Sequence, residues 1–218
     1  MGAAMCGHLI RGGFSATVYN RTPAKAQALV DQGATLASSP AEVAANSDVV
    51  FSIVGYPRDV REVILGDQGV LANLKEGSVV VDMTTSEPSL AKEVAAAAAA
   101  RKCRAMDAPV SGGDLGAKNG SLTIMCGSDE ETYDFMLPLL KLMGTARRLG
   151  PPGSGQHCKM ANQITIASSM IGMVEGMLYA HSAGLDVPQY IEAIRGGGAG
   201  SKSIELYSSR ILSGDFAP

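Results

Sequence analysis

The stretch "SVVVDMTTSEPSLAKEVAAAAAARKCRAMDAPV", residues 78–110, decides the fold class of this chain. Its two ends, residues 78–83 and 103–110, are short, largely apolar runs that predict buried strands. Between them, residues 87–102 are rich in alanine and begin with Glu-Pro-Ser, which predicts a helix with proline in its first turn. A buried strand, a helix and a second buried strand together predict a βαβ unit with parallel strands.

The same alternation extends over the first part of the chain and predicts an α/β fold with a parallel sheet and helices on both faces. Further strands are expected at residues 16–20, 48–54, 121–126 and 146–150. Further helices are expected near the N-terminus and at residues 23–33, 40–47, 57–65 and 129–143.

The pattern changes at "GPPGSG", residues 150–155, after which no strand is expected. Residues 156–184 predict one long helix that is apolar on most faces, so we expect it to be buried among other helices. Two shorter helices are expected at residues 187–195 and 201–214. The predicted domains are therefore residues 1–152, and residues 153–218 as the start of an incomplete all-α domain.

The composition is that of a globular protein: of 218 residues, 46% are hydrophobic and 18% are charged. A net charge of -3 gives no electrostatic reason to expect nucleic acid or an anionic membrane surface as a partner. No apolar run approaches the roughly 20 residues needed to span a bilayer. The four cysteines lie far apart, so we expect buried thiols in a reducing compartment, with no disulfide framework and no metal site.

Polar residues follow the first predicted strand, where a dinucleotide-binding fold places the adenosine ribose. Asn20 and Thr22 can form hydrogen bonds, and Arg21 can receive the 2′-phosphate of NADP. Thr22 before Pro23 is also typical of a helix N-cap beside a solvated arginine, and the tripeptide alone favours that interpretation.

Two more stretches lie at the carboxyl ends of predicted strands, where open α/β sheets bind ligands. In the first, Thr84, Thr85 and Ser86 are candidate ligand-binding residues, and Ser86 before Glu87 is also a candidate helix cap. In the second, Ser111, Gly112 and Gly113 offer a hydroxyl and accessible backbone N–H groups, which suit a carboxylate. A plain turn explains this second stretch equally well when it is considered alone.

Lys159 begins the most informative motif, "KMANQ", in the first turns of the predicted long helix. Asn162 and Gln163 lie three and four residues further on, so the three polar side chains share one helical face. Polar groups on an otherwise apolar helix are costly unless they are satisfied, and a desolvated lysine can act as a general acid or base. Chance polar residues at a helix start are the alternative.

Five stretches together resemble the β-hydroxyacid dehydrogenase family, whose members bind NAD(P) on a Rossmann-like sheet. They are "MGAAMCGHLIRGGF…VYNRT", "DMTTSEPS", "DAPVSGGDLGAKNGSLTIMCGSDEE", "GSGQHCKMANQI" and "GAGSKSIELYSSRIL". The resemblance implies a catalytic lysine at Lys159 and substrate binding by Ser111, Gly112, Gly113, Asn162 and Gln163. It implies cofactor binding by Gly2, Asn20, Arg21, Thr22, Val54 and Thr85.

The resemblance also implies the reaction: hydride transfer between NAD(P) and a small β-hydroxy acid such as 3-hydroxyisobutyrate, or the reverse reduction of a semialdehyde or glyoxylate. Arg21 without an acidic neighbour favours NADP over NAD. Family members are usually dimers or tetramers, and the plant-like resemblance implies mitochondria, whereas the bare chain implies the cytosol. Relatives that reduce imines or read chromatin generally replace the lysine, so its presence argues against those activities.

The chain departs from the family pattern at both ends. It begins inside the family's glycine motif, so Gly2 alone stands for that motif's last glycine, and the first strand is missing from the pattern. The family continues beyond "DFAP" into further helices and another cofactor-binding lysine. A truncated, catalytically inactive scaffold is therefore the alternative to an active dehydrogenase.

Overall fold

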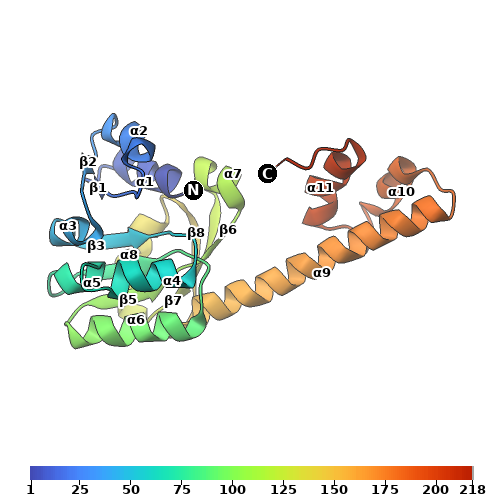
Figure 1. Cartoon of the computed structure of the whole chain (residues 1–218). Helices are drawn as coiled ribbons and strands as arrows, with labels where there is room; N and C mark the ends of the chain where they lie inside the picture. Colours follow the sequence, from blue (N-terminus) through green and yellow to red (C-terminus); the bar gives the residue numbers. More distant parts are fainter. Residues whose placement is uncertain (218) are drawn as a thin grey trace. The chain divides into compact units, whose positions relative to one another are not determined.

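The computed structural model describes residues 1–217 (Figure 1). The chain divides into two compact units, residues 1–159 and the residues from 160 onward. The first unit is an α/β domain and the second consists of helices, so the predicted fold class is confirmed. The exact domain boundary expected after residue 152 stays a prediction. No helix in residues 1–217 is both long enough and apolar enough to span a bilayer.

The first unit contains eight strands and its helices are mostly short. The strands are β1 (Thr17–Val18), β2 (Thr35–Leu36), β3 (Val49–Ser52), β4 (Val79–Asp82), β5 (Arg104–Asp107), β6 (Val110–Ser111), β7 (Leu122–Gly127) and β8 (Gly144–Gly150). The helices are α1 (Gly2–Arg11), η1 (Pro23–Ala26), α2 (Gln27–Val30), α3 (Pro40–Ala45), α4 (Pro57–Val60), η2 (Arg61–Leu65), α5 (Val70–Asn73), α6 (Pro88–Ala100), α7 (Gly113–Asn119) and α8 (Glu130–Leu140).

The main sheet has the strand order β3-β4-β5-β7-β6, with β8 also paired to β7. Strands β3, β4 and β5 are parallel, as the βαβ pattern predicts. The parallel arrangement does not extend to the other end of the sheet, where β7 runs antiparallel to both β5 and β6. Only α7 and short turns connect β6 to β7, and so short a link suits an antiparallel pair better than a parallel crossover.

Two apolar clusters cover the two faces of the sheet, and β4 contributes to both. Val79 and Val81 pack with Met136 of α8, in a cluster that α1 and α7 also join. Val80 points the other way and packs with Leu90 of α6, in a cluster completed by α3, α4 and α5 (Figure 1). Successive side chains of a strand point to opposite faces, which explains why the continuous apolar run of β4 is buried throughout.

Strands β1 and β2 form a separate parallel pair, and β2 was not predicted from the sequence. Within the described residues, β1 is bonded only to β2 and does not join the main sheet. The predicted strand at residues 16–20 is accordingly only two residues long.

Local signals set the ends of several helices. Helix α6 begins with Pro88 and continues through a run of alanines, the residue type with the highest helix propensity. The carboxylate of Asp129 accepts a hydrogen bond from the backbone N–H of Thr132 at 2.7 Å and so caps α8. The prediction that Ser86 caps α6 is wrong: Glu87 occupies the cap position, and its side chain makes no capping bond.

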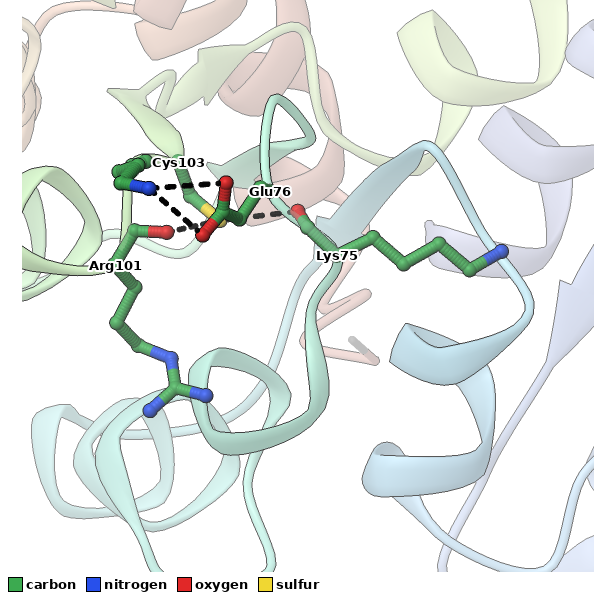
Figure 2. Close-up of polar contacts among 5 residues, drawn as sticks. Lys75, Glu76, Arg101 and Cys103 are labelled. Atoms are coloured by element: carbon green, nitrogen blue, oxygen red, sulfur yellow. Dashed lines mark hydrogen bonds and ion pairs between the residues drawn. The ribbon is translucent and has the colours of Figure 1, made fainter.

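The turn between α6 and β5 buries one of the four cysteines (Figure 2). The Cys103 thiol donates to the backbone carbonyl of Lys75 at 3.2 Å, and burial raises the pKa of this thiol. Lys102 adopts a left-handed φ of 55° at the turn, and its Nζ lies 3.1 Å from Glu76 Oε1. All four cysteines are free; Cys103 and Cys126 are buried as expected, whereas Cys6 and Cys158 are only half-buried.

The second unit holds most of α9 (Ser154–Ser182), together with α10 (Val187–Ile194) and α11 (Lys202–Leu212). Its core joins Met173 and Met177 of α9 to Ile191 and Ile204 of the shorter helices. The expectation that α9 is buried on most faces is wrong. Among residues 160–217, only α10 and α11 pack on the helix, so its opposite side leaves large apolar residues exposed; these are Ile164, Ile171, Leu178 and Tyr179.

Candidate active site

Two buried carboxylates stand side by side at the carboxyl ends of the central strands. Asp82 closes β4 and Asp107 closes β5, and the two residues are partners in the strand register. Their exposed fractions are 7% and 4%. Burial raises the pKa of Asp82 to about 6 and also raises the pKa of Asp107, because desolvation disfavours the charged form.

Asp107 anchors the first turn of α9. Its carboxylate accepts hydrogen bonds from the backbone N–H groups of Gly153 at 2.6 Å and Gln156 at 2.8 Å. These groups belong to the start of a helix, where N–H groups lack partners inside the helix and carboxylates are stabilised. A Cβ at Gly155 would lie 2.2 Å from the carbonyl oxygen of Met125, so only glycine lets the helix approach the strands this closely. The helix start is therefore fixed against the sheet.

Gln156 connects this helix start to the segment that follows β4. Its Nε2 donates to the carbonyl oxygen of Thr84 at 2.7 Å, and its Oε1 accepts from the backbone N–H of Ser86 at 2.8 Å. The side chain is only 1% exposed. Both polar atoms of the buried amide are thus satisfied, and the two bonds flank Thr85, which is exposed.

Thr84 is bonded on two further sides. Its backbone N–H donates to Asp82 Oδ1 at 3.0 Å, and its Oγ1 accepts from the backbone N–H of Val54 at 3.0 Å. The segment after β4 is therefore tied to the end of β4, to the chain after β3 and to α9.

Lys159 follows Gln156 by three residues on α9, so the two side chains lie on the same side of the helix. Lys159 is only 8% exposed, and none of the salt bridges within residues 1–217 involves it. Desolvation lowers the pKa of its amine, since burial disfavours the ammonium form. An amine of this kind is suited to take up and release a proton.

Two of the predicted substrate-binding residues, Asn162 and Gln163, belong to the second unit. Their side chains are bonded to each other, with Asn162 Nδ2 donating to Gln163 Oε1 at 3.0 Å. Their role as substrate anchors stays a prediction.

The other predicted substrate-binding residues lie where β6 meets α7. Ser111 ends β6, and Gly112 and Gly113 have φ values of 123° and 60°, which glycine adopts without strain. The stretch is not a plain turn, because Gly113–Asn119 forms α7. Backbone N–H groups at the start of this short helix remain available to a carboxylate, and that role stays a prediction.

A cavity of about 970 Å³ lies among α1, β1 and β3. Thr85 is not among its lining residues, whereas the other five predicted cofactor-binding residues line it: Gly2, Asn20, Arg21, Thr22 and Val54. A Cβ at Gly2 would lie 2.9 Å from Cγ2 of Ile53, so glycine lets α1 begin close to the chain after β3. Within residues 1–217, no side chain caps α1 and no acidic residue stands in its first turn, so its N–H groups are suited to a pyrophosphate.

The residues after β1 form an exposed rim of this cavity. Asn20 Oδ1 accepts the backbone N–H of Thr22 at 2.9 Å, and the Arg21 side chain is 80% exposed with Nη1 4.0 Å from Asp59 Oδ1. Thr22 does occupy the cap position of η1, but within the described chain its side chain makes no bond to that helix. Thr22 is therefore at the predicted cap position, but its side chain does not cap the helix.

Sequence reasoning missed Asp107 and Gln156, which fix the start of α9 against the sheet; Thr84 was among the predicted ligand-binding residues. Gln156 carried a usable signal, because it stands three residues before Lys159 in "GSGQHCK" and so shares its helical face. Asp107 carried no signal of this kind, because its partners lie 46 and 49 residues away along the chain.

Comparisons with known proteins agree with this geometry. Residues 1–162 match the family described as the NAD binding domain of 6-phosphogluconate dehydrogenase, and residues 153–218 match the NAD-binding family of NADP-dependent 3-hydroxyisobutyrate dehydrogenase. The chain belongs to the β-hydroxyacid dehydrogenase family. The predicted family and the NAD(P) cofactor class are thereby confirmed.

Individual relatives support the same assignment. The chain is 60% identical to a probable 3-hydroxyisobutyrate dehydrogenase-like protein of Arabidopsis thaliana, named mitochondrial, across 100% of this chain and 66% of the relative. Its fold matches a Mycobacterium tuberculosis 3-hydroxyisobutyrate dehydrogenase solved with L-serine (TM-score 0.86, 29% identity, 95% of this chain and 70% of that one). It also matches Psf3 in complex with NADP+ and 2-OPP (TM-score 0.88, 29% identity, 98% of this chain and 76% of that one). These relatives favour a dehydrogenase over the inactive scaffold.

Proposed function

We propose that this β-hydroxyacid dehydrogenase oxidises a small β-hydroxy acid, 3-hydroxyisobutyrate or a close analogue, and in reverse reduces the corresponding semialdehyde or glyoxylate. The observation that carries the proposal is the buried amine of Lys159, whose pKa is lowered and whose helix is bonded through Gln156 to the segment containing Thr85.

Lys159 moves the proton in this proposal. In oxidation, the neutral amine accepts the hydroxyl proton while the carbinol carbon loses a hydride and becomes a carbonyl carbon. In reduction, the ammonium returns that proton to the oxygen. Bound NAD(P) supplies the hydride acceptor and, in reverse, the hydride donor. Burial helps because it leaves more of the amine neutral near physiological pH.

The remaining residues hold the reactants. Backbone N–H groups of Gly112 and Gly113, with the hydroxyl of Ser111, bind the substrate carboxylate, which fixes the carbon that faces the nicotinamide. The amides of Asn162 and Gln163 bind the substrate from α9. The cofactor is held by Gly2, Asn20, Arg21, Thr22, Val54 and Thr85.

NADP is the preferred nucleotide in this proposal. Arg21 is an exposed cation on the rim of the cavity, 4.0 Å from Asp59, and its guanidinium can donate two parallel hydrogen bonds to a 2′-phosphate. We further infer that the protein acts as a homodimer or homotetramer in mitochondria, on the basis of its plant relative's name and of the family resemblance.

The proposal is tested with Lys159→Ala in the 218-residue chain, assayed with 3-hydroxyisobutyrate and NADP+. Turnover falls by at least about 10²-fold, the lower end of what a general acid/base contributes. Nucleotide affinity, followed by NADPH fluorescence, stays within about twofold because Lys159 is not among the residues proposed to hold the nucleotide.

Lys75→Ala is the matched control, because Lys75 is an exposed lysine whose only contact with the Cys103 thiol is through its backbone carbonyl (Figure 2). It keeps wild-type turnover. A fully active Lys159→Ala enzyme contradicts the proposed role, and a wild-type chain that binds NADPH but oxidises no β-hydroxy acid contradicts the proposed substrate class.

A further inference from the structure

Gln156 is the most completely buried polar side chain near Lys159, and the proposed chemistry does not use it. At 1% exposure it has no contact with solvent, so it cannot touch a substrate that enters from solvent. Its two amide atoms are bonded instead to backbone groups 70 and 72 residues away. We propose that Gln156 is a positioning residue, which holds the Thr84–Ser86 segment at a fixed place relative to Lys159. This inference rests on the proposed function.

The two hydrogen bonds define which way the amide points. Oε1 can only accept, and it meets the N–H of Ser86 at 2.8 Å; Nε2 can only donate, and it meets the carbonyl of Thr84 at 2.7 Å. A carboxylate of the same shape could keep the first bond, but it would face the Thr84 carbonyl with a second acceptor. The site therefore selects an amide over an acid of equal size.

The segment held by Gln156 has no other bond to α9 within the described residues. Asp82 and Val54 fix Thr84 to the ends of β4 and β3, both of which belong to the sheet. Gln156 is thus the side chain that transmits the position of α9 to the backbone on either side of Thr85.

The backbone of Gln156 is itself fixed, so its side chain acts from a rigid base. Asp107 binds its N–H, and the tight packing of Gly155 on Met125 leaves the helix start no room to shift. Lys159 lies three residues further along, about 4.5 Å along the axis of an α-helix. A change in the length or polarity of Gln156 therefore displaces the Thr85 backbone relative to the Lys159 amine, and displacements near 1 Å can lower a rate by about 10²-fold.

The test compares Gln156→Glu and Gln156→Met in the full 218-residue chain. Both variants are close in size to glutamine; the first loses the donor to Thr84, and the second loses both bonds. We expect kcat to fall about 10- to 100-fold, with a larger loss in Gln156→Met, while the KM for the substrate changes less than about threefold. The Ser86 amide exchanges faster with deuterium in Gln156→Met, a readout that does not depend on turnover.

Asn73→Asp is the matched control. Asn73 also donates its side-chain amide to a backbone carbonyl, that of Gly69 at 3.0 Å, but it lies in α5 outside the proposed machinery. It keeps wild-type kcat and Ser86 exchange. If the control and the Gln156 variants lost the same amount of thermal midpoint and the same amount of kcat, Gln156 would be a structural residue only.

The two proposals fail in different ways. If the wild-type enzyme is active and Lys159→Ala is inactive, but folded Gln156→Glu and Gln156→Met retain wild-type kcat and Ser86 exchange, the positioning role is overturned and the proposed function stands. If the wild-type chain turns over no substrate, the proposed function fails, and unchanged Ser86 exchange in Gln156→Met overturns the positioning of the segment separately.

Discussion

Two segments were expected at the cofactor from the sequence, and they are built in opposite ways. The Thr84–Ser86 segment is tied by buried side chains to β4, to the chain after β3 and to α9. The Asn20–Thr22 segment is exposed; its bonds are local, from Thr22 to Asn20 and from Lys25 to Thr22, and Arg21 only approaches Asp59 at 4.0 Å.

The difference indicates a division of labour. A segment whose backbone is bonded on both sides of Thr85 costs little to order when a ligand binds, so it can fix the geometry on which a rate depends. An exposed, loosely held cation contributes affinity for a charged group and can be changed with little effect on the fold. We therefore expect changes around Thr84–Ser86, the inner segment, to alter stability and rate. Changes in Asn20–Thr22, the outer segment, should alter nucleotide choice.

The largest effect is expected at Asp107, which fixes the start of α9, the helix whose Gln156 holds the Thr84–Ser86 segment. Asp107→Ala leaves the buried N–H groups of Gly153 and Gln156 without their acceptor, and each unsatisfied group costs on the order of 1–3 kcal/mol. The free energy of unfolding of the first unit falls by roughly 4 kcal/mol, measured by urea denaturation. Asp134→Ala, at an exposed position on α8, changes it by less than about 0.5 kcal/mol. A similar loss of unfolding free energy in both variants would mean that Asp107 has no special role in fixing the start of α9.

The next effect is a pH dependence set by Asp82. Its folded pKa of about 6 lies above the ordinary 3.8, so the folded state binds the proton more tightly than the unfolded state. This contribution to stability is complete below about pH 4 and is lost as pH rises through 6, a change of roughly 3 kcal/mol.

Asp82→Asn removes that titration but keeps an acceptor for the N–H of Thr84. Thermal midpoints of variant and wild type, measured from pH 4 to pH 7, should diverge with the variant becoming relatively more stable at the higher pH. If the two curves of thermal midpoint against pH ran parallel, the Asp82 carboxylate would not have a raised pKa in the folded protein.

The smallest effect is expected in the outer segment. Arg21→Ala weakens NADPH binding by about tenfold, equivalent to ~1.4 kcal/mol, and leaves NADH binding and the thermal midpoint unchanged. Arg58→Ala is the matched control, because Arg58 is equally exposed and equally close to Asp59 but does not line the cavity. Fluorescence titration with both nucleotides decides the matter, and equal losses for NADPH and NADH in Arg21→Ala would refute a 2′-phosphate site.

Much of the fold could be read from the sequence because the responsible signals are local. The buried run of β4, the alanine-rich α6 and the proline at its start each act within a few residues, and each element formed where it was expected. Lys159 was recognisable for the same reason: a lysine with two amides at helical spacing is a local pattern.

Three features escaped prediction, the first two because they depend on partners far along the chain. The antiparallel direction of β7 is decided by its pairing with β5 and β6. The exposure of one side of α9 is decided by which helices pack on it, and the apolar sequence of α9 does not show how many helices do so. Thr22 stands at a helix start, but its hydroxyl makes no capping bond there.

The sequence by itself determined the α/β alternation, the family and the residue types available for proton transfer. Only the tertiary structure decided that Asp107 caps α9 and that Gln156 ties Lys159's helix to the Thr84–Ser86 segment. The physical reason is that periodicity and capping are properties of neighbouring residues, whereas a buried hydrogen bond exists only after folding has brought both partners out of water together.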